Sequence, residues 1–477
     1  MFNYSKELVS INPSNGKEIW KGMISTKKDI EEAVEKAQKY QNTWRKKQIE
    51  ERQDIILKFA SLVKENTEEA AKIISEENGK PLWEAKMEVK SLINKVQVVF
   101  DAYEERAKTK YKELTNGRES ITRYRPHGVM AVLGPFNFPM SMPNSHIMPA
   151  LYAGNTVVFK PSERTPKSAL FYRDLWIRAG LPDDALQIVI GGAKTGELLV
   201  KDNRINGILF IGSRKAGKAI EKIGISEDKL CVLEMGGNSP LIIWDYSDIR
   251  AAINIVIQSA YISSGQRCSA ARRLIVNKSL SKEFIPFLSK AIDAIIVGDS
   301  LSENPTPFIG PMIDSKASSL FMEQYEELVN KGAKILVPSK ILLHLGNSFV
   351  KPGLLDVTNI DCPDEEVFGP LLQLTIVDTI EQAVSVANQT KYGLAAGIVT
   401  EDQSIYEYFF DNIHAGIINR NQSLTGSTTI APFGGIKGSG NYHPAGYLSV
   451  DYCVYGCASI ETSETKAPNS LSHGLNF

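Results

Sequence analysis

The chain has 477 residues, of which 43% are hydrophobic and 23% are charged. This length is enough for two or three domains with a large buried core, and the composition is that of a folded globular protein. The 54 basic and 55 acidic side chains leave a formal charge of −1, which excludes a global electrostatic preference for nucleic acid or an anionic membrane. Partners are therefore expected to bind at local sites.

Five cysteines are present, and their odd number and irregular spacing fit neither a disulfide scaffold nor a paired zinc motif, so no metal site is expected. Residues 1–7 lack the basic start and apolar stretch of an export signal. No later run approaches the roughly 20 apolar residues of a membrane span. We therefore expect a cytoplasmic protein with reduced thiols.

The first part of the chain is expected to be helical. Between Thr26 and about Ala107, apolar residues recur at helical spacing, which predicts charged amphipathic helices on the outside of a domain. The segment from Tyr111 to Arg125 is polar and ends in an alternating pattern, which predicts a hairpin or an arm. Such an arm is a candidate for contact with another subunit.

Short apolar runs that alternate with helical segments follow this arm. They predict strands at residues 129–133, 156–160, 186–190, 207–212 and 232–235. Strands separated by helices indicate a parallel sheet covered on both faces, an architecture typical of nucleotide binding. A second α/β region begins near Pro240, with strands expected at residues 241–244, 273–277 and 416–419. The segment from Tyr442 onward is expected to be irregular.

One carboxylate and one thiol stand in loops rich in glycine. Glu234 lies in Leu233-Glu234-Met235-Gly236-Gly237-Asn238, and Cys268 lies in Gly265-Gln266-Arg267-Cys268-Ser269. A thiolate can attack a carbonyl carbon, and a carboxylate can take a proton from a thiol or from water. The pair therefore suggests covalent catalysis through a thioester, provided that the fold brings the two loops together.

The other cysteines are expected to be inert. Burial without reactivity is the commonest fate of a free thiol, and it is the expectation for Cys231, Cys362, Cys453 and Cys457. Cys268 differs because its neighbours are polar and include an arginine, which favours an accessible thiol with a lowered pKa.

Three further segments carry polar groups at the ends of predicted strands, where sites form in parallel sheets. Asn137, in Gly134-Pro135-Phe136-Asn137-Phe138-Pro139, can donate to an oxyanion or simply satisfy a turn. Lys160 and Glu163 follow another strand, and a carboxylate there can accept from ribose hydroxyls and repel a 2′-phosphate, although a surface loop is the default. The loop at residues 210–217 opens a helix, as phosphate-binding loops do, but it lacks the GxGxxG pattern.

Together these segments resemble the aldehyde dehydrogenase superfamily, with six motifs in the family's order between about residue 10 and residue 477. The resemblance implies that Cys268 is the nucleophile, that Glu234 is the general base, and that Asn137 and the Cys268 backbone N–H form an oxyanion hole. It also implies an NAD site. Its residues would be Lys160 and Glu163 at the ribose, Gly212, Ser213 and Gly217 in the phosphate loop, and Glu366 and Phe368, from Glu365-Glu366-Val367-Phe368-Gly369-Pro370, at the nicotinamide ribose and ring.

The fold class that the resemblance implies is α/β. A Rossmann-type NAD-binding domain would comprise residues 1–107 and 127–236, and an α/β catalytic domain would comprise residues 237–441. A small β oligomerisation arm at residues 108–126 and the tail at residues 442–477 would pair subunits into a homodimer or a homotetramer.

Segments outside these motifs resemble the branch of the family that oxidises N-succinylglutamate 5-semialdehyde in arginine catabolism. They are residues 124–128, 143–146, 424–426, 440–441, 451–453 and 474–477. The chain departs from this branch at Arg420, where the branch has Trp, and at His443, where it has Arg. Both are candidate substrate-binding residues, because a substrate that carries carboxylates is recognised by cations.

Three alternatives stay open at this point. The substrate can be another acidic semialdehyde, such as succinate or glutamate semialdehyde. A CoA-acylating enzyme would use the same cysteine, although such enzymes tend to lack the base at Glu234. A non-catalytic protein with this fold is the third alternative, and the presence of both Cys268 and Glu234 argues against it.

Overall fold

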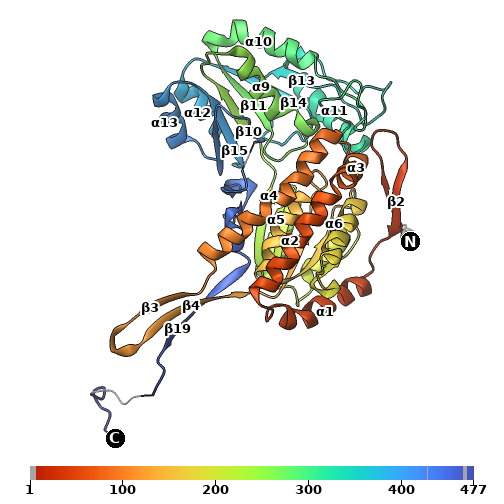
Figure 1. Ribbon diagram of the computed structural model, residues 1–477. Coiled ribbons are helices and arrows are strands. Elements are labelled where there is room, and N and C mark those ends of the chain that lie inside the picture. The colour runs from red at the N-terminus through yellow and green to blue at the C-terminus, as the bar shows by residue number, and fades with distance from the viewer. Residues whose placement is uncertain (1–6, 427, 466–469, 477) are drawn as a thin grey trace.

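A computed structural model describes residues 7–426, 428–465 and 470–476, and it contains two large sheets that are each covered by helices (Figure 1). A long three-stranded arm projects from this body. Within the described ranges, none of the helices combines the length and the apolar content needed to cross a membrane.

The first sheet is parallel, with the order β7-β6-β5-β8-β9. Its strands are β5 (Val129–Leu133), β6 (Thr156–Lys160), β7 (Leu186–Ile188), β8 (Gly207–Gly212) and β9 (Leu230–Met235). All five predicted strands are present, with shifts of two residues at the ends of β7 and β9. The apolar runs predicted these strands well because helices bury both faces of the sheet.

One face of this sheet is covered by five helices. They are α2 (Ile49–Glu65), α3 (Thr67–Asn78), α4 (Leu82–Arg106), α5 (Ser141–Tyr152) and α6 (Pro166–Arg178). Helix α2 has the exposed charged face that was predicted, whereas α3 and α4 are buried more deeply than the prediction of helices on the outside implied. The chain folds α5 and α6 against them, so their apolar stripes are buried between layers.

The opposite face of the sheet is covered by α1 (Lys27–Trp44), α7 (Ala193–Lys201) and α8 (Arg214–Ser226). Helix α1 begins after Thr26, whose hydroxyl accepts from the backbone N–H of Asp29 at 3.3 Å. The Asp29 carboxylate accepts in return from the Thr26 backbone N–H at 2.7 Å, which completes a capping box.

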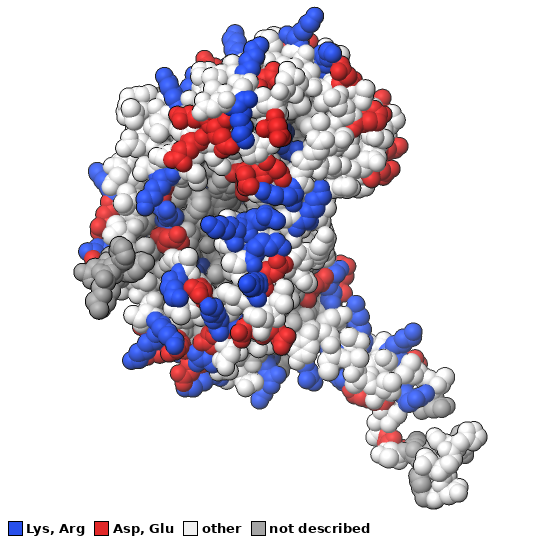
Figure 2. Space-filling model, turned by 180° about the vertical axis from the view of Figure 1, so that it is seen from behind, with Lys and Arg blue, Asp and Glu red and all other residues white. Residues whose placement is uncertain are grey.

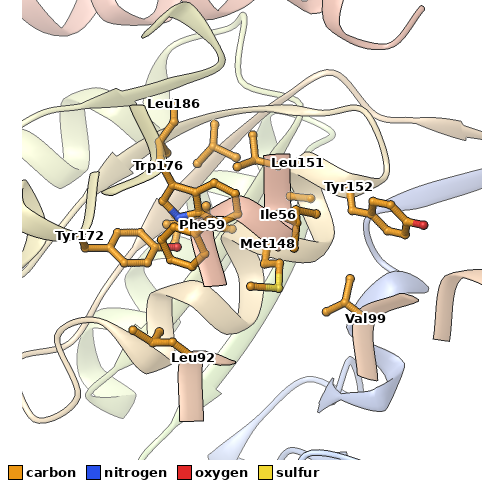
Figure 3. Close-up of a cluster of buried hydrophobic side chains, with 14 of the residues drawn as sticks. Ile56, Phe59, Leu92, Val99, Met148, Leu151, Tyr152, Tyr172, Trp176 and Leu186 are labelled. Carbon is orange, nitrogen blue, oxygen red and sulfur yellow. The ribbon is translucent and has the colours of Figure 1, made fainter. Parts of the chain in front are cut away.

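Aromatic stacking forms the centre of the main core (Figure 3). The rings of Phe59 on α2 and Trp176 on α6 are stacked, with centroids 3.9 Å apart and planes 8° apart. Tyr172 meets Phe59 edge-on at 5.7 Å, and its hydroxyl donates to Asn144 Oδ1 at 2.8 Å. Phe59 therefore joins the outer helices to the helix layer next to the sheet.

Replacing Phe59 by Ala should lower the free energy of unfolding by about 3–5 kcal/mol, because the ring is fully buried and its removal leaves a cavity. Denaturant unfolding followed by circular dichroism measures this loss. Phe287→Ala is the matched control, since Phe287 on α10 (Lys278–Asp293) is 54% exposed. A loss at Phe59 no larger than that at Phe287 would contradict the packing described above.

The second sheet has the order β12-β13-β14-β11-β10-β15-β16 and is parallel except for the β12–β13 pair. Its strands are β10 (Ser239–Ile243), β11 (Ala271–Asn277), β12 (Lys334–Val337), β13 (Gly353–Asp356), β14 (Leu371–Val377), β15 (Ala395–Val399) and β16 (Ile417–Arg420). The three strands predicted in this region correspond to β10, β11 and β16. The other four were not predicted.

Helices again cover both faces of this second sheet (Figure 1). Helices α9 (Ile249–Ala260) and α10 pack on one face, and α12 (Ile380–Asn388) and α13 (Gln403–Asn412) pack on the other. Helix α11 (Ser315–Asn330) packs with β13 in a smaller cluster. These helices leave the carboxyl ends of the parallel strands free to form a site.

The arm is a three-stranded antiparallel sheet with the order β19-β4-β3. Strands β3 (Lys110–Glu113) and β4 (Glu119–Pro126) form the predicted hairpin, and β19 (Val454–Glu461) pairs with β4 along its whole length. The prediction of an irregular tail is therefore wrong for β19. Its pairing partner β4 lies far away in the sequence, so no local pattern predicts this strand. Subunit contact through this arm stays a prediction.

The remaining elements are short. A hairpin of β1 (Glu7–Ile11) and β2 (Glu18–Met23) precedes α1, and β17 (Pro432–Phe433) pairs with β18 (Ala445–Gly446). The 3-10 helices are η1 (Thr115–Gly117), η2 (Asp183–Ala185), η3 (Ile262–Gly265), η4 (Lys437–Ser439) and η5 (Tyr447–Val450). Tyr452 and Cys453, expected to belong to the tail, instead pack in the main core. The predicted domain limits stay a prediction.

Candidate active site

A cavity of about 1190 Å³ lies at the carboxyl ends of the strands of the first sheet and is closed by loops of the second sheet. Seen from behind, the molecule is hollowed near the middle of this face, and Lys and Arg side chains gather along the rim (Figure 2). The cavity brings together nine of the predicted site residues. They are Asn137, Lys160, Glu163, Gly212, Ser213, Glu234, Cys268, Glu366 and Phe368.

The loop that carries Cys268 begins in a left-handed turn. Ser263, Ser264 and Gly265 have φ values of 57°, 53° and 70°. A side chain at Gly265 would meet the carbonyl oxygen of Gly369 at 2.2 Å, so only glycine fits there. Left-handed conformations at non-glycine residues cost of the order of 1–3 kcal/mol each, so the surrounding contacts must hold this turn in place.

Two arginines supply those contacts. Arg267 donates to Ser263 Oγ at 2.8 Å and to Glu84 Oε1 on α4 at 2.9 Å. Arg272, which is fully buried, donates to the carbonyl oxygen of Arg267 at 3.0 Å. The Cys268 loop is thus tied to α4 by charge-assisted hydrogen bonds, which are stronger than neutral ones.

Cys268 is partly exposed to the cavity, but the expected lowering of its pKa is wrong. Burial, together with the nearby carboxylates of Glu366 and Glu234, raises the pKa of the thiol to about 12. Arg267 is next to Cys268 in the sequence, but its guanidinium donates to Glu84, and that of Arg272 donates to a backbone oxygen. Cys268 is therefore a neutral thiol at neutral pH and needs a proton acceptor.

Glu234 is a carboxyl group suited to accept such a proton. It stands near the end of β9, its side chain is buried, and its Oε1 accepts from the backbone N–H of Ala445 at 3.3 Å. Its Oε2 is buried and has no hydrogen-bond partner among the described residues. Burial raises the pKa of Glu234 to about 8. A carboxyl group with this pKa can take and release a proton near neutral pH.

Asn137 lies directly beside the Cys268 loop. Its Nδ2 donates to the carbonyl oxygen of Gln266 at 2.8 Å. An amide nitrogen carries two hydrogens, so the second can donate to another acceptor in the cavity. The contact orients the Asn137 amide toward the loop that holds the thiol.

Lys160 and Glu163 lie together on the cavity wall at the end of β6. The Lys160 ammonium donates to the carbonyl oxygen of Pro161 at 2.8 Å and lies 3.8 Å from Glu163 Oε2. Burial lowers the pKa of Lys160, while the Glu163 side chain is 42% exposed. A carboxylate and an ammonium that reach the same space suit the two hydroxyls of a ribose.

The N-terminus of α8 faces the same cavity. Ser213 is its N-cap residue, and the Ser213 hydroxyl accepts from the backbone N–H of Ala216 at 3.4 Å. Free N–H groups at such an end attract a phosphate group. Gly217 does not line the cavity; it is buried in α8, and a side chain there would overlap Met235 at 2.5 Å.

Glu366 and Phe368 reach the cavity from the second α/β region. Glu366 Oε1 accepts from the Gly237 backbone N–H at 3.3 Å, and a side chain at Gly236 would meet Glu366 Oε2 at 1.8 Å. Burial raises the pKa of Glu366 to about 7. The Arg272 guanidinium lies 5.4 Å from the ring centroid of Phe368. The donor and acceptor groups along this wall fit a nicotinamide dinucleotide.

The two candidate substrate-binding residues, Arg420 and His443, do not line this cavity within the described part of the chain. Arg420 donates to the carbonyl oxygens of Thr400 at 3.2 Å and Glu401 at 3.0 Å, and its guanidinium lies 4.8 Å from the ring centroid of Tyr406. His443 is exposed. Arg420 therefore binds the backbone just before the N-terminus of α13. This structural role accounts for an arginine at this position without a bound substrate.

Several charged residues in or beside the site were not predicted from the sequence. Glu84, Glu88 and Lys95 lie on buried positions of α4, and Lys80, just before the helix, pairs with Glu88 at 2.7 Å. Their recurrence at helical spacing among apolar residues was the available signal, because charged side chains are almost never buried without a partner. Of the four other cysteines, only Cys453 is buried as expected, and Cys231, Cys362 and Cys457 are partly exposed.

Comparison with known proteins gives a single family. The model of the Aldehyde dehydrogenase family matches residues 2–454. An N-succinylglutamate 5-semialdehyde dehydrogenase from Novosphingobium aromaticivorans is 41% identical over 473 residues, which is 98% of either chain. Another from Sphingopyxis alaskensis is 41% identical over 478 residues, covering 99% of this chain and 97% of that protein.

Solved structures agree with this match. The crystal structure of an aldehyde dehydrogenase from Brucella melitensis biovar abortus 2308 superposes with a TM-score of 0.90 at 31% identity, and covers 96% of this chain and 94% of its own. The predicted α/β fold class is confirmed. A match along almost the whole sequence and a shared fold lead to one conclusion: this chain is an oxidoreductase that belongs to the aldehyde dehydrogenase family.

Proposed function

We propose that the chain oxidises N-succinylglutamate 5-semialdehyde to N-succinylglutamate with NAD, as a step of arginine catabolism, through a thioester on Cys268. The observation that carries this proposal is the cavity that joins Cys268, Glu234 and Asn137 to Lys160 and Glu163. The substrate is supported by the two relatives named for it, since both are 41% identical over nearly their full lengths.

In the first half of the reaction, Cys268 Sγ attacks the aldehyde carbon. The Glu234 carboxylate accepts the thiol proton, because the thiol is neutral at neutral pH. The oxygen of the resulting thiohemiacetal is stabilised by the second N–H of the Asn137 amide and by the Cys268 backbone N–H. Bound NAD supplies the acceptor for the hydride that leaves this carbon. The carbonyl re-forms, and the acyl group is held on Cys268 as a thioester.

In the second half, Glu234 first releases its proton to water and then takes a proton from the attacking water molecule. The hydroxide adds to the thioester carbon, and the C–S bond breaks. The Cys268 thiolate leaves and regains a proton, and the product is a carboxylic acid. One carboxyl group with a pKa of about 8 can serve both halves, because each protonation state is accessible near neutral pH.

Glu163 supports NAD as the cofactor in preference to NADP. A half-exposed carboxylate beside Lys160 can accept hydrogen bonds from both ribose hydroxyls, and it repels a 2′-phosphate. The N-terminus of α8 would hold the pyrophosphate, and Glu366 and Phe368 would orient the nicotinamide end.

A substrate panel tests the proposal. N-succinylglutamate, succinate and glutamate semialdehydes are compared by kcat/KM with NAD and with NADP, and NADH or NADPH formation is followed. We expect the highest value with N-succinylglutamate 5-semialdehyde and NAD, without added CoA. A preference for another semialdehyde would overturn the substrate, and a CoA requirement would overturn water as the acyl acceptor. Failure of every aldehyde to yield reduced cofactor would favour the non-catalytic alternative.

A further inference from the structure

Two helices contribute a part of the cavity wall that carries none of the predicted dinucleotide-binding residues. Helix α4 contributes Met87, Glu88, Ser91 and Lys95, which recur along one side of the helix, and α5 contributes Ser141, Met142 and Ser145. Backbone N–H groups at Met140 and Ser141 donate to Glu88 Oε1 at 3.0 and 3.1 Å, so the two helices are joined at this level. This wall lines the same cavity as Cys268, so it is available to the substrate chain beyond the aldehyde carbon.

The cavity is lined by four cations, and three of them have a carboxylate partner. Lys160 lies 3.8 Å from Glu163, Lys194 lies 3.1 Å from Glu197, and Arg267 lies 2.9 Å from Glu84. Lys95 is the one lining cation that has no carboxylate within salt-bridge distance among the described residues. Arg267 is also committed to the Cys268 loop, so it is not free to bind a ligand.

Lys95 is 6% exposed, and burial of an unpaired ammonium is unfavourable. Burial lowers the pKa of Lys95 to about 8, and the charge of Glu234 on β9 opposes that lowering. His146 on α5 faces it as well, and burial together with the Lys95 charge lowers the pKa of His146 to about 3. The His146 ring accordingly stays neutral, and its Nδ1 hydrogen bonds to the Tyr452 hydroxyl at 2.8 Å. An incoming carboxylate would relieve the cost of the buried charge.

We propose that Lys95 binds a carboxylate of the substrate and thereby selects acidic aldehydes over neutral ones. This inference rests on the proposed function, because it assumes a substrate with carboxylates. Lys95 supplies the cation that was sought at Arg420 and His443, neither of which lines the cavity. Two of the three serine hydroxyls of this wall already donate to backbone oxygens, Ser91 to Glu88 and Ser145 to Met142, so Lys95 is the cation that this wall offers to a carboxylate.

The test compares N-succinylglutamate 5-semialdehyde with its dimethyl ester, which presents the same aldehyde without the charges. In the unaltered enzyme, kcat/KM should be higher for the acid. Lys95→Met should lower kcat/KM for the acid by about 10- to 100-fold, the range expected for a lost charge-assisted hydrogen bond, and should leave the value for the ester within a few-fold. Lys95→Arg should retain most of the preference for the acid.

The matched control is Lys90→Met, because Lys90 is exposed on the same helix and should change neither value. An equal loss for acid and ester in Lys95→Met would overturn the proposal, since it would mean that Lys95 acts through Glu234 or through folding. Loss of the preference for the acid in Lys90→Met would overturn it as well. If the unaltered enzyme does not oxidise the acid at all, the proposed function fails instead.

The unaltered enzyme provides a second test that does not depend on the folding of a variant. Lys95 is charged below its pKa of about 8 and neutral above it. As pH rises through that value, the ratio of KM for the acid to KM for the ester should increase. Glu234 titrates in the same range, but it acts on the aldehyde carbon of both substrates, so its effect cancels in the ratio. A ratio of the two KM values that does not change with pH would overturn the role of Lys95.

Discussion

Cys268→Ala should abolish aldehyde-dependent NADH formation, with a loss of about 10⁴-fold or more in kcat, because among the described residues no other thiol lines the cavity to form the thioester. NAD binding should persist, since Lys160, Glu163 and the start of α8 are untouched. Cofactor binding is measured by calorimetry and turnover by NADH absorbance, on the same preparation. Retained turnover would reject Cys268 as the nucleophile.

Cys457→Ala is the control for this variant. Cys457 is also a partly exposed free thiol, but it lies on β19 in the projecting arm and should be dispensable for turnover. Alkylation offers a further check on the unaltered enzyme. A thiol with a pKa of about 12 should react slowly with iodoacetamide at neutral pH, even though it is open to the cavity. Fast, selective alkylation of Cys268 at neutral pH would contradict the raised pKa.

Glu234→Gln should lower the steady-state rate by about 10²- to 10⁴-fold, because both proton transfers lose their acceptor. The pH profile of the unaltered enzyme should show the same dependence. The pKa of Glu234 is raised to about 8, so the carboxylate is present above that value and is lost as pH falls below it. The rate of the unaltered enzyme with a neutral aldehyde should therefore rise through pH 8, and the Gln variant should lack this rise.

Glu234→Asp is the matched variant for this experiment. It keeps a carboxyl group on a shorter side chain, so part of the rate and the rise with pH should return. NADH formation across a pH series measures both variants. An unchanged rate in Glu234→Gln would remove Glu234 from the mechanism. A pH profile that is the same with Glu234 and with Gln would assign the titration to another group.

Much of the fold was predictable from the sequence, for a physical reason. Strands buried on both faces are continuous apolar runs, so β5, β6 and β8 were predicted within a residue of their ends. The second sheet was predicted less completely. Strand β13 has only four residues, and the pairing of β13 and β15 is set by strands that follow later in the sequence. The missed strand β19 owes its extended form to eight pairs with β4.

The candidate chemistry was determined largely by the sequence alone. The thiol of Cys268, the carboxyl group of Glu234 and the amide of Asn137 are recognisable by residue type and by flanking glycines and prolines, which are local properties of the chain. The charge states of these groups could not be predicted from the sequence, because a pKa depends on burial and on groups that approach from other elements. Contacts between distant segments leave the Cys268 thiol neutral and leave the Lys95 ammonium without a carboxylate partner among the described residues. Such contacts also place Arg420 at the start of α13 and not in the cavity. Only the folded chain decides which side chains share the cavity and which charges remain there without a partner.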